Sequence, residues 1–254
     1  MTVTATLATG IAQAAPWGIA LDGLLAAELH ARTKADRRAA GHVDPPALDV
    51  ADPVDLDLPL ARCDAGAGLW HWAATCAHPT RPTRPDNRPH DQPHTTAIEE
   101  DIPPDVHYWT GRTDPRPLEQ LTIAMPTVVS DRKGRYRARR MPLLVTVCTT
   151  VTWRAVGDPG AVRDLLADVT AIGKKRSQGE GQVLRWDITA DATLDPWDAA
   201  HLHPDGRLGR PTPTSCLVDH PEVTGGGYGT AGLRPPYMHP ARQHPLQLPA
   251  LLDT

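Results

Sequence analysis

Proline is the feature of this sequence that most limits how the chain can fold. The 254 residues include 27 prolines and 20 glycines. Proline has a fixed φ and no amide hydrogen, so it interrupts helices and central strands. A long helical bundle or coiled coil is therefore disfavoured, and we expect short elements with irregular connections. The chain is long enough to bury a hydrophobic core and corresponds to one or two domains.

Charge and cysteine content narrow the class of protein. The net charge is −4 and the isoelectric point is near 6.3, which excludes a uniformly basic nucleic-acid binder but allows a local basic patch. Cys63, Cys76, Cys148 and Cys216 include no C-x-x-C pair, so we expect reduced thiols in a cytoplasmic protein. Residues 11–21 form the longest nearly apolar stretch, which is too short to cross a membrane.

The spacing of apolar residues predicts an α+β fold. Alternation and β-branched residues predict strands over residues 2–9, 54–60, 69–76, 141–154 and 182–189. Leucines at helical spacing predict a helix over residues 21–32. Asp158-Pro159 is typical of a helix start, and Gly173 is typical of the end of that helix. This order predicts a ferredoxin-like (RRM-like) β-α-β-β-α-β sheet with helices on one face.

Two further regions follow from the distribution of proline and glycine. Residues 78–117 carry nine prolines, which predicts a Pro-rich inserted arm within an insertion over about residues 78–140. Proline and glycine return after residue 201, so we expect an irregular C-terminal tail over residues 201–254 without its own strand ladder. We predict that residues 1–254 form a single domain.

A loop after the second predicted helix combines three glycines with three consecutive cations. Its sequence is Gly173-Lys174-Lys175-Arg176-Ser177-Gln178-Gly179-Glu180-Gly181. The glycines expose backbone amides, the cations match phosphate, and Ser177 and Gln178 add neutral hydrogen bonds. The helix precedes the loop, so it is neither a Walker A loop nor a Rossmann fingerprint. The sequence favours binding of a phosphate backbone, with a solvated basic turn as the alternative.

A second basic segment lies before the longest predicted strand. It reads Asp131-Arg132-Lys133-Gly134-Arg135-Tyr136-Arg137-Ala138-Arg139-Arg140. In an extended chain Arg135, Arg137 and Arg139 project from one face. Arginine pairs with phosphate through two parallel hydrogen bonds, and Tyr136 can stack on a base. We interpret the two basic segments as a track for nucleic acid, with a solvated edge strand as the alternative.

The histidines do not form a recognisable metal motif. His71, Cys76 and His78 are close in sequence, as are His201 and His203, but no spacing matches a zinc ribbon or an H-E-x-x-H helix. We expect no metal and no other cofactor.

Catalysis has little support in the sequence. No G-x-S-x-G motif is present, and we predict no catalytic residue. A metal-free ribonuclease would need an acid and a base, for which His30 with Tyr136 or Lys174 are the candidates. His30 at the end of the first helix is better explained as an exposed residue near the negative end of the helix dipole.

Several of these segments, in this order, resemble one family of proteins. Residues 172–183 (I-G-K-K-R-S-Q-G-E-G-Q-V) resemble the glycine-rich loop of the RAMP superfamily of CRISPR-associated proteins. Leu21-Asp22-Gly23-Leu24-Leu25-Ala26 is similar to the first-helix motif of the Cas-five-like (Csf-three-like) subunit of type IV CRISPR systems. The same order continues with residues 130–136, Trp153, Gly157-Asp158 and Arg234-Pro235-Pro236-Tyr237.

The resemblance carries expectations about fold and function. It implies an RRM-like fold and a noncatalytic RNA-binding subunit of a ribonucleoprotein for antiviral defence. That subunit grips the 5′ handle of the CRISPR RNA and caps the effector complex. The implied partners are a Cas-seven-like helical backbone subunit and other effector subunits, with target nucleic acid reached through the complex. Some relatives cut precursor RNA, so an endoribonuclease is the alternative. Glu180 stands where the family loop has an aromatic or small residue.

Overall fold

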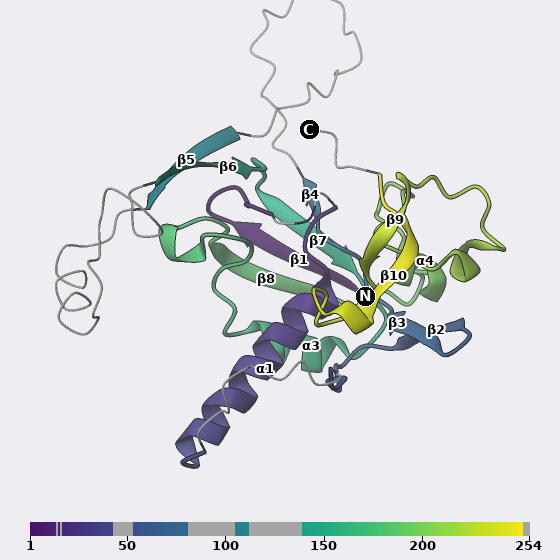
Figure 1. Ribbon diagram of the computed structural model, residues 1–254, viewed down its shortest axis with the longest axis horizontal. Helices are drawn as coiled ribbons and strands as arrows, with labels where there is room; N and C mark the ends of the chain where they lie inside the picture. The colour runs from purple at the N-terminus through teal and green to yellow at the C-terminus, as the bar shows by residue number, and fades with distance from the viewer. Residues whose placement is uncertain (14, 16, 43–52, 81–104, 112–138, 251–254) are drawn as a thin grey trace, which may run out of the picture.

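A computed structural model describes residues 1–13, 15, 17–42, 53–80, 105–111 and 139–250 (Figure 1). The α-helices are α1 (Leu21–Ala39), α3 (Pro159–Leu166) and α4 (Pro196–His201). The strands are β1 (Thr2–Leu7), β2 (Arg62–Gly66), β3 (Leu69–Trp72), β4 (His78–Thr80), β5 (Asp105–Gly111), β6 (Arg139–Val145), β7 (Thr150–Arg154), β8 (Val183–Thr189), β9 (Gly227–Gly232) and β10 (Gln243–Leu248). Single-turn 3₁₀ helices are η2 (Arg176–Gln178), η3 (Thr214–Leu217) and η4 (Pro240–Arg242). The chain is therefore a mixed α and β protein, as its apolar pattern predicts.

A four-stranded antiparallel sheet lies at the centre, with the strand order β4-β7-β1-β8. Within it Val3 of β1 is opposite Trp153 of β7 and Ile188 of β8. Alternate residues of β1 and β7 are buried, because side chains along a strand point to opposite faces. Two-stranded ladders join β2 to β3, β5 to β6, and β9 to β10.

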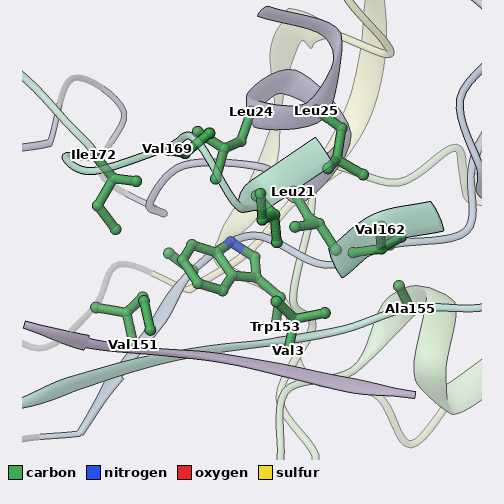
Figure 2. Packing of buried hydrophobic residues seen from close by; sticks show 14 of the residues in the cluster. Val3, Leu21, Leu24, Leu25, Val151, Trp153, Ala155, Val162, Val169 and Ile172 are labelled. Atoms are coloured by element: carbon green, nitrogen blue, oxygen red, sulfur yellow. The ribbon is translucent and has the colours of Figure 1, made fainter. Parts of the chain in front are cut away.

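The main core fills the space between this sheet and helices α1 and α3. Figure 2 shows Leu21, Leu24 and Leu25 of α1 and Val162 of α3 above Trp153. The indole of Trp153 is fully buried, and its N–H donates to the Ile19 carbonyl at 2.8 Å. A buried aromatic ring with a satisfied N–H contributes several kcal/mol, so truncation of Trp153 to alanine should cost about 3–5 kcal/mol.

The first helix is longer than its sequence pattern predicts. It extends to Ala39, and its second half projects away from the sheet (Figure 1). Apolar spacing ends near residue 32, but Arg32 pairs with Glu28 at 2.8 Å and with Asp168 at 3.0 Å, which ties the exposed turns to the region after α3. His30 consequently lies inside the helix and is exposed, so its predicted position at the helix end is wrong.

The second helix begins where the sequence predicts and ends earlier. Asp158 caps it by accepting the amides of Gly160 at 2.8 Å and Ala161 at 3.2 Å. The helix ends at Leu166, so Gly173 is not its C-terminal cap. Ile172 is still buried, which explains why the apolar spacing continues past the real helix end.

Three predicted strands differ from the structure. Residues 141–154 form two strands, β6 and β7, which belong to different sheets. Residues 54–60 form no strand, although Leu58 and Leu60 are buried and Leu60 forms an isolated bridge to Gly157. The strand predicted over residues 69–76 ends at Trp72 and pairs with β2 in a hairpin.

The predicted inserted arm is described only in part. His78–Thr80 forms β4 at the edge of the central sheet, so the central sheet includes the first residues of the predicted insertion. Residues 105–111 and 139–145 pair as β5 and β6. Residues 81–104 and 112–138 lie outside the described residues.

The expectation of an irregular C-terminal tail is wrong. Strands β9 and β10 form an antiparallel ladder from Gly227–Leu248 to Gly232–Gln243. Ala231, Leu233 and Leu246 form a second small core against which Trp17 packs. Because β9 contains several glycines, its sequence lacks the alternation of apolar residues by which a strand is predicted.

None of the described helices is long and apolar enough to cross a membrane.

Candidate nucleic-acid interface

At the two ends of the glycine-rich loop of residues 173–181, which form its base, the surrounding backbone leaves room only for glycine. Gly173 has a φ of +87°, and a Cβ there would lie 2.5 Å from the Ala12 carbonyl oxygen. Gly181 has a φ of +65°, and a Cβ there would overlap the carbonyl oxygen of Ile172. Both glycines therefore permit close packing of backbone on backbone, which is a different role from the predicted approach of a ligand.

Hydrogen bonds fix this base against the segment that follows β1. The bonds run from the Lys174 amide to the Ala12 carbonyl at 2.7 Å, from the Gly181 amide to the Gly10 carbonyl at 3.0 Å, and from the Thr9 hydroxyl to the Gly179 carbonyl at 3.0 Å. The two ends of the loop are also joined, because the Ile172 amide donates to the Gly181 carbonyl at 2.9 Å. The loop is thus a closed hairpin-like turn at the end of β1 and the start of β8.

The tip of the loop exposes cations. Lys175 and Gly179 both adopt left-handed conformations, with φ of +59° and +92°, and between them residues 176–178 form η2. The side chains of Lys174 and Arg176 are exposed, and within the described part of the chain no carboxylate forms an ion pair with either of them. A Cβ on Gly179 would meet no atom within 4 Å, so this glycine faces open space.

The sheet face that points away from the helices is polar. Thr2, Thr4 and Thr6 of β1 lie there with Thr150 and Thr152 of β7, according to the strand register. On β8 the same face carries an exposed ion pair between Arg185 and Asp187 at 2.7 Å. Trp153 and Trp186 of these strands pack toward the helix side. The face formed by β1, β7 and β8 therefore offers hydroxyl and charged groups rather than aromatic rings for base stacking.

The second basic segment lies mostly outside the described residues. This holds for Arg132, Lys133, Arg135, Tyr136 and Arg137. Arg139 and Arg140 begin β6, where their backbones pair with Gly111 and Thr110 of β5. The shared track of the two basic segments therefore stays a prediction.

Two motifs from opposite ends of the chain contact each other. The Tyr237 hydroxyl donates to Asp22 Oδ1 at 2.5 Å, and a Cβ on Gly23 would lie 3.0 Å from the Tyr237 ring. Arg234 lies over the Trp70 ring at 4.2 Å and pairs with Asp55 at 3.1 Å. The first-helix motif and the Arg-Pro-Pro-Tyr motif therefore hold the C-terminal segment against α1 and the β2–β3 hairpin.

A cluster of cysteine and histidine side chains is the feature that sequence reasoning missed. Cys63, His71, His201 and Cys216 place one ligand atom each within 4.8 Å of one another. The neighbouring Cys216 and then the two histidines lower the pKa of Cys63 to about 2, and the proximity of Cys63 raises the pKa of Cys216. The four residues come from separate elements, so no local spacing reveals them.

Three of the neighbouring cysteines and histidines that the sequence suggested, Cys76, His78 and His203, lie outside the cluster. Cys76 is buried, and burial raises its pKa to about 12. His78 packs against His203, with ring centroids 4.8 Å apart. His71 and His201 belong to the cluster.

A comparison with protein families shows where this chain belongs. The family model described as CRISPR type IV associated protein Csf3 matches residues 1–247. This range includes the central sheet, the glycine-rich loop, both contacting motifs and the cysteine–histidine cluster. No curated protein matches the chain.

Proposed function

This chain belongs to the Csf3 family of CRISPR type IV associated proteins and is a Cas-five-like subunit, and from that premise we propose that it binds RNA without cleaving it. The proposed ligand is the 5′ handle of the CRISPR RNA. In this role the subunit caps one end of an effector complex and contacts a Cas-seven-like backbone subunit. The family supports association with a type IV CRISPR system, and the geometry of the loop supports the RNA contact.

The order of elements supports a ferredoxin-like fold for the RNA-binding unit. Along the chain β1, α1, β4, β7, α3 and β8 follow the β-α-β-β-α-β order, and the antiparallel sheet runs β4-β7-β1-β8. Each helix then connects two parallel strands that are separated by one antiparallel strand. The β2–β3 and β5–β6 hairpins are insertions between these elements.

The observation that carries the proposal is the exposed cationic tip on a fixed base. Glycines 173 and 181 hold the base against residues 10–12, so the tip keeps its position relative to the sheet. Lys174 and Arg176 are exposed there. A preorganised pair of cations binds a polyanion at a lower entropic cost than flexible side chains on a mobile loop.

The polar sheet face favours recognition of the RNA backbone. Threonine hydroxyls on β1 and β7 can bond to phosphate and ribose oxygens, including the 2′-hydroxyl. The described residues of β1, β7 and β8 provide no aromatic ring on this face, so phosphate and ribose contacts carry the binding that we propose.

A salt titration tests this role. Binding of a labelled CRISPR repeat RNA to the purified chain should weaken steeply with salt, with a slope of about −0.7 per phosphate contact in a plot of log affinity against log salt. Lys174→Gln and Arg176→Gln should each weaken binding and reduce the slope by about 0.7. Arg37→Gln is the matched control, since Arg37 is exposed in the last turn of α1. Unchanged affinity and slope in both loop variants would rule out the loop contact.

The noncatalytic part of the proposal has a separate test. The same repeat RNA is incubated with the protein without added metal, and its length is measured on a denaturing gel. Intact RNA at protein concentrations that saturate binding is the expected result. A defined cleavage product would instead assign the protein to the processing endoribonucleases. Of the residues that an acid–base cleavage would use, His30 is exposed on α1, Lys174 is exposed on the glycine-rich loop, and Tyr136 lies outside the described residues.

A further inference from the structure

We propose that Cys63, His71, His201 and Cys216 bind one structural Zn²⁺ ion. Cys63 lies on β2, His71 on β3, His201 at the end of α4, and Cys216 in η3. This site is independent of the proposed RNA contact, since it involves none of the loop residues 173–181.

The distances between ligand atoms fit a tetrahedral site. The two Nε2 atoms of His71 and His201 are 3.3 Å apart. Cys63 Sγ lies 3.8 Å from His201 Nε2, and Cys216 Sγ lies 3.7 Å from His71 Nε2. A tetrahedron with Zn–N bonds of about 2.0 Å and Zn–S bonds of about 2.3 Å has N–N edges of about 3.3 Å and N–S edges of about 3.6 Å. These three separations match the corresponding edges within a few tenths of an ångström.

Both imidazole rings are oriented as metal ligands. His71 Nδ1 lies 3.0 Å from the Trp72 carbonyl, and His201 Nδ1 lies 2.8 Å from the Trp197 carbonyl. A carbonyl only accepts, so each Nδ1 must carry the hydrogen, and each neutral ring then presents a lone pair at Nε2. A carbonyl bonded to the distal nitrogen is the usual outer contact of a metal-bound histidine. Two lone pairs that face each other at 3.3 Å repel unless a cation lies between them.

The chemistry of the donors selects zinc and a structural role. Two thiolates and two neutral imidazoles balance the charge of a divalent ion, and this donor set favours zinc over magnesium or calcium. Four protein ligands leave no open position for a substrate or water, which is typical of structural sites. His71 and His201 are fully buried, while Cys63 and Cys216 are half-buried, which gives the ion a path from solvent.

The ion would join parts of the chain that are distant in sequence. Cys63 and His71 are directly opposite each other in the β2–β3 ladder, so the hairpin alone supplies two of the four ligands. The other two ligands come from the region after β8, which already contacts the hairpin through a Ser215 hydroxyl bond to the Ala65 carbonyl at 2.6 Å. The zinc thus fixes the hairpin that lies between α1 and β4 onto the C-terminal region.

Metal analysis of the full chain tests the proposal. Protein purified under reducing conditions from cells grown with added zinc should contain about one equivalent of zinc per chain. Cys63→Ser and Cys216→Ser should each lose most of this zinc. Cys76→Ala and Cys148→Ala are matched controls, since both cysteines are buried outside the cluster, and they should retain it. A wild-type protein without zinc, or equal zinc in all four variants, would refute the site.

A second measurement on the wild-type protein remains decisive if the cluster variants do not fold. A mercurial thiol reagent should release the zinc, and reconstitution with Co²⁺ should produce thiolate-to-cobalt charge-transfer bands and the d–d bands of tetrahedral coordination. Absence of these bands overturns the proposal. Mass spectrometry that finds a Cys63–Cys216 disulfide in the reduced preparation also overturns it.

Discussion

At the scale of single residues, a buried polar network explains two motifs that the sequence presents without context. Asp22 and Arg210 are almost fully buried, and Arg210 Nη2 lies 3.7 Å from Asp22 Oδ2. Burial raises the pKa of Asp22, an effect that Arg210 opposes. The Arg210 guanidinium also donates to the backbone carbonyls of Trp72, Ala74 and Leu233. A buried arginine with this many acceptors links the β3 region, α1 and the C-terminal segment.

Removal of one hydroxyl tests how much this network stabilises the fold. Tyr237→Phe keeps the ring against Gly23 and removes the donor to Asp22. Because the buried carboxyl then loses a hydrogen bond, the free energy of unfolding should fall by about 1–3 kcal/mol. Urea denaturation measures the change. Tyr228→Phe is the matched control, since Tyr228 is 77% exposed, and it should leave the free energy unchanged. If the two variants had the same free energy of unfolding, the hydrogen bond from Tyr237 to Asp22 would not stabilise the fold as we expect.

Sequence reasoning at this scale succeeds for local contacts. Asp158 is recognisable as a helix cap because its partners are two and three residues away. Arg210 is not recognisable, since its partners lie about 136 residues earlier and 23 residues later. Cys63 and His71 are likewise hidden, because residues 62–66 lack the apolar alternation that would reveal their hairpin.

At the scale of elements, the glycine-rich loop contains glycines that have two different structural roles but look alike in sequence. Gly181 has its φ in the left-handed region and backbone against it, whereas Gly179 has a left-handed φ with open space around it. The sequence predicts a glycine-rich turn at this place. It does not reveal that Gly173 packs against Ala12, which is about 160 residues away, or that Gly181 packs against Ile172 across the base of the loop.

Alanine substitution distinguishes these two uses. Gly179→Ala should cost about 1 kcal/mol, since only the left-handed φ is unfavourable for alanine. Gly181→Ala should cost several kcal/mol, because the new methyl group also overlaps the Ile172 carbonyl and separates the loop from the end of β1. Thermal or chemical unfolding of the two variants gives the difference. Similar costs would show that the base of the loop moves freely.

Element ends are the weakest part of the sequence-based prediction for a physical reason. Apolar spacing reports burial, and burial continues past the helix where Ile172 packs into the core from a turn. In α1 the reverse occurs, since ion pairs extend the helix beyond its buried stripe. Strands β9 and β10 escape prediction because glycine and proline in them leave little apolar contrast.

At the scale of the whole molecule, the pH dependence of stability should reflect a histidine at the sheet edge. Burial lowers the pKa of His78 on β4 below its ordinary value of 6.5, and the carboxylate of Asp205 only partly opposes this. The unfolded chain then binds the proton more tightly than the folded chain. The contribution of His78 to stability is therefore fully present above pH 6.5 and is lost as the pH decreases below that value.

A histidine replacement tests this origin. The melting temperature of His78→Gln should depend less on pH below 6.5 than that of the wild-type protein. His30→Gln is the matched control because His30 is exposed on α1, and it should follow the wild-type curve. Identical pH curves for all three proteins would exclude His78 as a contributor.

The class of fold can be predicted from the sequence, whereas the pairing of distant strands cannot. Alternating strands and amphipathic helices predict an α and β protein, and the structure confirms this class. The sheet order depends on pairing between segments that are far apart, such as Thr2 with Arg154 and Thr189, and no local pattern encodes those partners. The same holds for the proposed zinc ligands, which meet only after the hairpin and the C-terminal region have both formed.

The central position of β1 has a consequence for biosynthesis. Both hydrogen-bonded neighbours of this first strand, β7 and β8, come after residue 149, so β1 leaves the ribosome long before either partner has been translated. Closing so long a segment is entropically costly and slow. The nascent strand must therefore wait unpaired with its edges open to chaperones, and a pause in translation before β8 would prolong that vulnerable interval.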